Sequence, residues 1–207
     1  MNEIMADLDK IEQTIKNGDE PLLCQYNRLP LTIKDFWAWS ASDIMSNTTR
    51  SRFAEFIVAT ATNVDLRIPR QEWESYDLLT PEGIKIEVKS SAYIQSWYQK
   101  EISKIIFSIK PARYWNSSNG EQESIAIRHA DIYVMCLLKY KDQSTINPLD
   151  MDQWDFYVLS RQELDNYKRS KHSITLKSLE NLTKPVTYTG LLDEIKIKHR
   201  YQKSTTA

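Results

Sequence analysis

The sequence predicts an α/β protein in which helices flank a mixed sheet. Residues 47–63 have the apolar periodicity of a helix, and the segments that follow them read as short strands. Residues 131–140, DIYVMCLLKY, form a near-continuous apolar run, which is typical of a strand buried on both faces. Helical patterns return at residues 161–170 and 190–200. Helices before and after a run of strands favour a layered α/β architecture.

The bulk composition narrows the class of protein. The chain has 207 residues, enough for a single domain with its own core. Its net charge is −1, so any basic surface for nucleic acid must be local. Cys24 and Cys136 lie far apart without a CxxC partner, which excludes a thiol-based metal site. Because no stretch approaches the roughly 20 apolar residues of a membrane span, we expect a cytoplasmic protein without membrane contact.

The first 46 residues are expected to form a helical extension. Residues 3–16 carry a narrow apolar stripe that ends near Gly18, and the pattern is helical. The positions of this stripe are Ile4, Leu8, Ile11 and Ile15. A polar link follows, and residues 32–45, TIKDFWAWSASDIM, then read as an aromatic-rich helix.

The helix predicted at residues 47–63 carries a glutamate among apolar residues. We expect Asn47 or Thr48 to cap it, because short polar side chains satisfy the free N–H groups of a first helical turn. Its main apolar face is expected to contain Phe53, Phe56, Ile57 and Thr60. Glu55 falls on a neighbouring strip with Val58 and Ala59, a poor environment for a carboxylate.

Short strands are predicted from residue 75 onward. They are residues 75–79, 84–90, 104–110, 131–140, 153–160 and 173–176. With the helices at 161–170 and 190–200, residues 161–207 form a C-terminal extension of helices and a strand.

The turn between the first two strands sets a register. In Thr80-Pro81-Glu82-Gly83-Ile84, Pro81 supplies the fixed φ of a type I turn and Gly83 accepts the left-handed position after it. If Thr80 pairs with Ile84, alternate side chains separate into two sides. Leu78 faces Ile86 and Tyr76 faces Val88 on the apolar side, while Asp77 faces Glu87 and Ser75 faces Lys89 on the other.

Two carboxylates placed in this way require a compensating charge. Directly opposed side chains have Cβ atoms about 5 Å apart, and like charges at that spacing are destabilising. Asp77 and Glu87 would therefore share a proton or bind a cation, and Lys89 would offset part of the repulsion. One or two carboxylates beside open positions suit Mg²⁺. The alternative is an ordinary solvated hairpin face, since charged residues make up 27% of the chain.

This arrangement resembles the PD-(D/E)xK nuclease superfamily, which has the restriction-endonuclease-like fold. The matching positions are Glu55 on the helix, Asp77 on the first strand, and Glu87-Val88-Lys89 on the second. Tyr76 stands where the superfamily pattern has proline. The resemblance implies a nuclease core at about residues 48–160, with residues 1–46 and 161–207 as extensions.

The resemblance also implies roles for these residues. Asp77, Glu87 and the Val88 carbonyl would bind Mg²⁺ or Mn²⁺, and Glu55 would complete the metal shell. Lys89 would orient the attacking water and stabilise charge on the phosphate. These four side chains, Asp77, Glu87, Lys89 and Glu55, are the predicted catalytic residues.

A segment directly after this site is a candidate substrate surface. Aromatic and basic side chains alternate over residues 93–115, where cations can contact phosphates and aromatic rings can stack on bases. The predicted substrate-binding residues are Ser90, Gln95, Trp97, Tyr98 and Lys100. The alternative is that the aromatic rings belong to the core and the lysines to solvated edges.

Other chemistries are poorly supported. The chain lacks a Walker loop, and its three histidines are scattered without metal spacing, although His129 could approach the site. The resulting hypothesis is an Mg²⁺-dependent endonuclease of the restriction or repair type that acts on DNA. A non-catalytic interaction module, or a subunit of a defence or repair complex, is the alternative. A homodimer is left open by the sequence.

Overall fold

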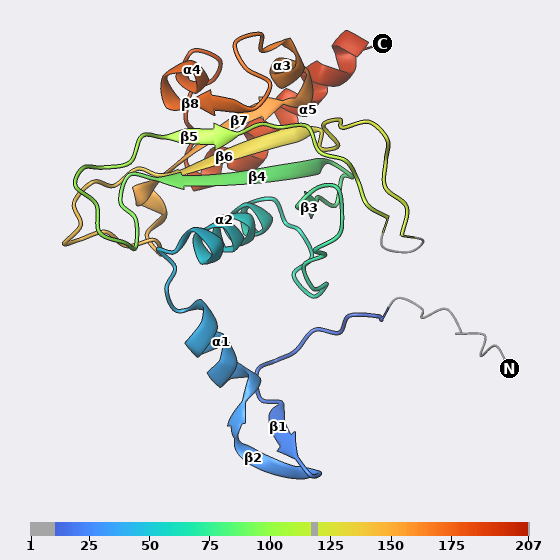
Figure 1. Ribbon diagram of the computed structural model, residues 1–207. Helices are drawn as coiled ribbons and strands as arrows, with labels where there is room; N and C mark the ends of the chain where they lie inside the picture. Colours follow the sequence, from blue (N-terminus) through green and yellow to red (C-terminus); the bar gives the residue numbers. More distant parts are fainter. Residues whose placement is uncertain (1–10, 117–119, 207) are drawn as a thin grey trace, which may run out of the picture.

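A mixed four-stranded sheet forms the centre of the molecule (Figure 1). The computed structural model describes residues 11–116 and 120–206. In spatial order the strands are β3 (Leu78–Leu79), β4 (Lys85–Ala92), β6 (Ile132–Leu138) and β7 (Trp154–Ser160). The β4 strand is parallel to β6, whereas the outer pairs β3–β4 and β6–β7 are antiparallel. The predicted α/β architecture with a mixed sheet is therefore confirmed.

The β6 strand is the centre of the core. All seven of its residues are buried, because it lies between β4 and β7 and is covered on both faces. Because both faces of β6 are covered, apolar side chains are favoured at every position and not only at every second one. This explains the continuous apolar run from which the strand was predicted.

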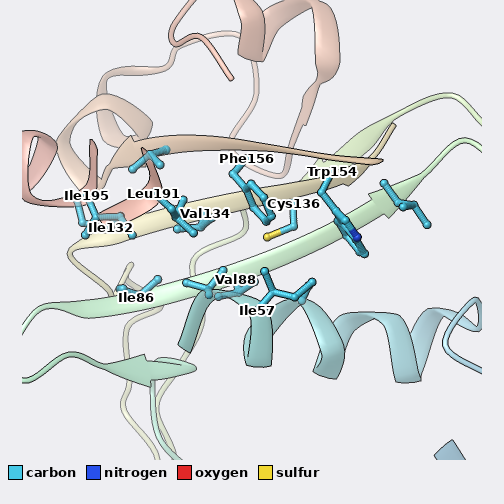
Figure 2. Close-up of a cluster of buried hydrophobic side chains, with 14 of the residues drawn as sticks. Ile57, Ile86, Val88, Ile132, Val134, Cys136, Trp154, Phe156, Leu191 and Ile195 are labelled. Atoms are coloured by element: carbon cyan, nitrogen blue, oxygen red, sulfur yellow. The ribbon is translucent and has the colours of Figure 1, made fainter. Parts of the chain in front are cut away.

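Two helices cover one face of the sheet. They are α2 (Asn47–Ala61) and α5 (Leu191–Thr206). Figure 2 shows Ile57 of α2 beside Val88 of β4, with Leu191 and Ile195 of α5 above Ile132 and Val134 of β6. The strand residues on this face occupy alternate positions, as the pleat of a strand requires.

The opposite face is covered by a small sheet and two short helices. The small sheet pairs β5 (Ile106–Ser108) with β8 (Ser173–Thr175). The helices are α3 (Arg161–Asn166) and α4 (Leu176–Glu180). The short 3₁₀ turns η1 (Met151–Gln153) and η2 (Tyr188–Gly190) precede β7 and α5. Phe107, Ile174 and Leu164 pack here against Tyr133 and Met135 of β6, which point away from α2.

The α2 helix differs in two details from its prediction. Its cap is Ser46, whose side chain accepts a hydrogen bond from the Thr49 N–H group, and not Asn47 or Thr48. Its most deeply buried apolar side chains are Ala54, Ile57, Val58 and Ala59, while Phe53 is partly buried and Phe56 is exposed. Ala54 and Ala59 are small, so the helix can approach β4 closely, and the larger rings of Phe53 and Phe56 lie outside the most deeply buried part of the contact.

The N-terminal extension is not purely helical, contrary to the prediction. Residues 1–10 lie outside the described residues, and residues 11–16 are not helical. The expected polar link contains a hairpin of β1 (Pro21–Cys24) and β2 (Asn27–Thr32), and α1 (Ile33–Ala41) follows. Gln25 and Tyr26 both have positive φ, which is the geometry of a tight two-residue hairpin turn. Neither residue is glycine, so the turn carried no compositional signal.

Two further expectations concern cysteines and membranes. Cys24 is exposed and Cys136 is buried, and both are free thiols. Among the described residues, no helix has both the length and the apolar character needed to cross a bilayer.

Candidate functional site

The turn between β3 and β4 has the predicted geometry. Leu78 pairs with Ile86 and Leu79 with Lys85. The Thr80 N–H donates to the Ile84 carbonyl at 3.0 Å, and Gly83 adopts a φ of 79° and donates to the Thr80 carbonyl at 2.9 Å. The left-handed conformation at Gly83 is one that a side chain would strain, so the glycine is required here.

The strand pairing changes at Asp77. The β3 strand contains only Leu78 and Leu79, and the Asp77 N–H donates to the Ile86 carbonyl at 3.0 Å, which places two residues opposite one as in a bulge. The Val88 N–H then donates to the Asp77 carboxylate at 2.7 Å. The predicted pairing of Tyr76 with Val88 is therefore wrong. Tyr76 packs with the cluster on the opposite face of the sheet from Val88.

Glu87 and Lys89 lie on the face of β4 that points away from α2. They alternate with Ile86 and Val88, which pack under the helix, and their side chains form an ion pair with each other. The Glu87 side chain is 22% exposed and that of Lys89 is 33% exposed. These charges are therefore half-buried, unlike those of a solvated hairpin face, which was the alternative reading of this pattern.

Glu55 belongs to a second ion pair at the edge of the sheet. Both of its carboxylate oxygens accept hydrogen bonds from Arg70, the contact from Nη2 measuring 3.2 Å. The same Nη2 atom lies 3.8 Å from Oδ1 of Asp77. Arg70 therefore connects Glu55 on α2 with Asp77, the residue directly before β3.

Arg70 was absent from the predicted site. It lies in residues 62–74, between α2 and the first predicted strand, where the sequence has neither helical nor strand periodicity. Only the sign of its charge could have suggested that it pairs with the buried Glu55.

The crowded charges change the acidity of these groups. Burial, reinforced by the charge of Asp77, raises the pKa of Glu87, and Lys89 opposes this only in part. Burial also raises the pKa of Glu55, although the hydrogen bonds from Arg70 oppose the shift. Burial acts to lower the pKa of Lys89, but the charges of Glu87, Asp77 and Glu55 outweigh it and the pKa is raised. Lys89 therefore keeps its proton, while the carboxylates are destabilised as anions.

Asp77 and Glu87 open onto one cavity of about 330 Å³, called here the carboxylate cavity. Its other walls come from residues 72–76, residues 112–115 and His129. The rings of Trp73 and Trp115 meet there edge-on, with centroids 5.0 Å apart. The prediction that His129 could approach the site is consistent with this position, whereas Trp73 carried no signal in the sequence.

Asp77 also lines a second, more apolar cavity of about 580 Å³. This cavity lies between α2, residues 64–71 and the β3 turn, and it contains Glu55 and Arg70. Glu55 does not line the carboxylate cavity. Asp77 is thus shared by the two cavities, together with Glu74 and Tyr76.

The donor set of the carboxylate cavity fits a hard cation with two protein carboxylates. Asp77 and Glu87 supply oxygen atoms beside open space, which is the pattern that Mg²⁺ accepts when water and substrate phosphate complete its shell. The Val88 N–H points to the Asp77 edge of β4, and the carbonyl of the same residue points to that edge too, because both groups of a strand residue face the same neighbour.

Glu55 fits this donor set less well, because both of its oxygens are bound by Arg70. Within residues 11–116 and 120–206, no group of three or more aspartate, glutamate, histidine and cysteine side chains is arranged to hold a metal. The arrangement therefore offers a cation two carboxylates.

The predicted substrate-binding residues do not gather in either cavity. Gln95 is buried, and its side-chain oxygen accepts a hydrogen bond from Arg50 at 3.2 Å. The hydroxyl groups of Ser90 and Ser51 lie 3.4 Å apart. Trp97, Tyr98 and Lys100 are exposed on the segment that follows β4. Asp77 and Glu87 lie near the start of β4, so these three residues are at the other end of the strand.

Comparison with known proteins gives one family match. The family described as bacteriophage T4 endonuclease IV matches residues 32–178. Among solved structures, a bacterial homing endonuclease is similar over 78% of this chain and 99% of its own, with 17% sequence identity and a TM-score of 0.40. Among curated proteins there is no significant match.

Proposed function

The chain belongs to the bacteriophage T4 endonuclease IV family, and from this premise we propose that it is a metal-dependent endonuclease that hydrolyses phosphodiester bonds in DNA. The observation that carries the proposal is that Asp77 and Glu87 line one open cavity while Lys89 is ion-paired with Glu87. Three charged groups are thereby held half-buried at the edge of a sheet. Burial and neighbouring charges shift the pKa of Glu87 and of Lys89, and groups shifted in this way beside a cavity are typical of active sites.

Asp77 and Glu87 are proposed to hold Mg²⁺ or Mn²⁺, with the Val88 carbonyl as a third ligand. When bound, such a cation polarises a phosphoryl oxygen and lowers the pKa of a bound water. The hydrogen bond from the Val88 N–H holds Oδ2 of Asp77 at 2.7 Å, while Oδ1 lies 3.8 Å from Nη2 of Arg70. Burial and the charge of Asp77 raise the pKa of Glu87, and a cation held by these carboxylates would favour their ionised forms.

Lys89 is proposed to act on the phosphate and the attacking water. Its ion pair with Glu87 keeps its ammonium group charged and restricts its position. A fixed cation in a half-buried site stabilises the negative charge that develops on a phosphate during hydrolysis.

Glu55 is proposed to act through Arg70 and not as a metal ligand. It binds the guanidinium on two oxygens, and this holds Nη2 near Asp77. This role differs from the one implied by the PD-(D/E)xK resemblance. The pattern of Asp77, Glu87 and Lys89 supports membership of that superfamily, as does the mixed sheet with α2 on one face.

DNA is proposed as the substrate, and exposed residues after β4 support a contact with it. Trp97, Tyr98 and Lys100 combine ring faces and a cation, as a nucleic-acid surface requires. Gln95 and Ser90 are not included, because their side-chain contacts are within the protein.

The test is cleavage of plasmid, linear duplex and single-stranded DNA with Mg²⁺ or Mn²⁺, compared with RNA. Asp77→Asn and Glu87→Gln should abolish cleavage. Glu82→Gln is the matched control, because Glu82 lies in the same hairpin but pairs with Lys196. Mn²⁺ binding measured by electron paramagnetic resonance is the second readout. Absence of both cleavage and Mn²⁺ binding in the wild type would contradict the proposal and leave a non-catalytic interaction module.

A further inference from the structure

The hairpin and the first helix form an N-terminal module, residues 21–41, that stands apart from the sheet (Figure 1). It contains no buried residue. Its local order comes from a few contacts at the start of α1. Thr32 and Asp35 form a capping box, and the Lys34 N–H donates to the carbonyl of Gly18 at 3.0 Å.

The N-terminal module exposes an unusual amount of apolar surface. Eight large apolar side chains are exposed in it, namely Leu22, Leu23, Tyr26, Leu29, Leu31, Phe36, Trp37 and Trp39. Tyr26 is fully exposed and Trp39 is 84% exposed. At roughly 150–250 Å² for a large side chain, the exposed parts of these eight amount to roughly 900 Å². Neighbours such as Leu22 and Leu23 point to opposite sides of a strand, so this area is a sum over several sides of the module. The sum exceeds the largest single apolar patch of a typical monomer, about 300–600 Å².

A module of this kind requires a cover to be stable. A two-stranded hairpin alone is marginally stable in water, and a nine-residue helix is too short to hold by itself. Neither element buries a side chain against the sheet that could compensate. The apolar area is about what one partner buries in a standard protein interface, roughly 800 Å².

The charges around the module do not favour nucleic acid as the cover. Residues 21–41 contain one acid, Asp35, and two cations, Arg28 and Lys34, so the module carries few charges of either sign. A surface for DNA needs an excess of cations to neutralise phosphates. An apolar surface with few charges is instead typical of the core of a homodimer interface.

We propose that the N-terminal module is a dimerisation element that packs against the same module of a second copy of this chain. A two-fold axis brings identical surfaces together, so one apolar module supplies both sides of the interface. Both strands of the hairpin are edge strands in a two-stranded sheet, so their outer backbone groups can pair with those of a second copy. The inference is independent of the nuclease chemistry.

The proposal predicts a dimer that single polar substitutions in the module dissociate. The full chain at roughly 50 µM, above the micromolar range of weak complexes, should have twice the mass of one chain in light scattering after size exclusion. Trp39→Ser and Leu23→Ser should convert it to a monomer in which the sheet domain keeps its cooperative thermal unfolding, while the circular dichroism signal falls by no more than the contribution of residues 21–41. Leu149→Ser is the matched control, because Leu149 is 62% exposed on the sheet domain.

A spin label places the contact within the module. Cys24 is exposed on the hairpin and Cys136 is buried, so a nitroxide reagent reacts with Cys24. A dipolar coupling between two labels is expected in the wild type and should disappear in Trp39→Ser. A wild-type monomer at this concentration overturns the proposal, whether DNA or another protein covers the module. A dimer that survives both module substitutions, or one without coupling between labels, overturns it too.

Discussion

Removal of the Lys89 charge tests the chemistry of the site most directly. In Lys89→Met the apolar part of the side chain is kept and the ammonium group is lost. A single preorganised donor at a developing negative charge accounts for about 10²–10³ in rate. Because a third of the Lys89 side chain is exposed to water, we expect the lower part of this range, about 100-fold or about 2.7 kcal/mol.

The same substitution should change the pH dependence in a defined direction. Burial and the charge of Asp77 raise the pKa of Glu87, and Lys89 is the cation that opposes them. Without Lys89 the pKa of Glu87 rises further, so a higher pH is needed to ionise the carboxylate that holds the cation. The acidic limb of the cleavage profile should therefore move to higher pH, while in Lys89→Arg it should stay near that of the wild type.

The assay is single-turnover cleavage of supercoiled plasmid with enzyme in excess, followed between roughly pH 5.5 and 8.5. Lys85→Met is the matched control. Lys85 lies on the same face of β4, but it is exposed and its ammonium stands over the Tyr76 ring at 5.1 Å. A Lys89→Met rate within about threefold of the wild type, or an acidic limb that does not move, would refute the assigned role.

Three further outcomes are expected. Asp77→Asn should abolish the Mn²⁺-dependent rise in melting temperature, whereas the metal-free melting temperature should change by only a few degrees, because asparagine can still accept the Val88 N–H. Gln95→Ala should cost about 1–3 kcal/mol in denaturant unfolding, because a buried partner of Arg50 is lost, and it should leave DNA affinity in fluorescence anisotropy unchanged. Trp154→Ala should lower the melting temperature by roughly 10 °C, because a fully buried ring is removed, and a change beyond a few degrees in the exposed control Trp97→Ala would contradict this reasoning.

The sequence predicted the parts of the fold that depend on local pattern. The β6 strand was recognised because both of its faces are covered, and the β3–β4 turn because only glycine accepts the conformation at position 83 without strain. The pairing of Leu78 with Ile86 followed from the length of that turn. In these elements a few neighbouring residues determine the structure.

Features that depend on tertiary contacts were not predictable in this way. The β1–β2 hairpin turns at Gln25 and Tyr26, which carry no turn signal, and residues 11–16 are not helical although they have an apolar stripe. The buried face of α2 was placed on its largest side chains, yet the close approach of β4 selects the smaller ones near Ala54. The sequence predicted Gln95 as a polar residue near the site. Its burial against Arg50 depends on a tertiary contact that the residue pattern does not indicate.

The irregularity at Asp77 is the main reason why the site differs from its prediction. In a regular hairpin Asp77 would lie directly opposite Glu87, and the two charges would repel at close range. The bulge instead lets the Asp77 carboxylate accept the Val88 N–H in place of a backbone carbonyl. It also carries the aspartate to the sheet edge, where Arg70 contacts it from the side of α2. A carboxylate that replaces a strand partner is held as firmly as the strand itself, and this is the rigidity that a cation site needs.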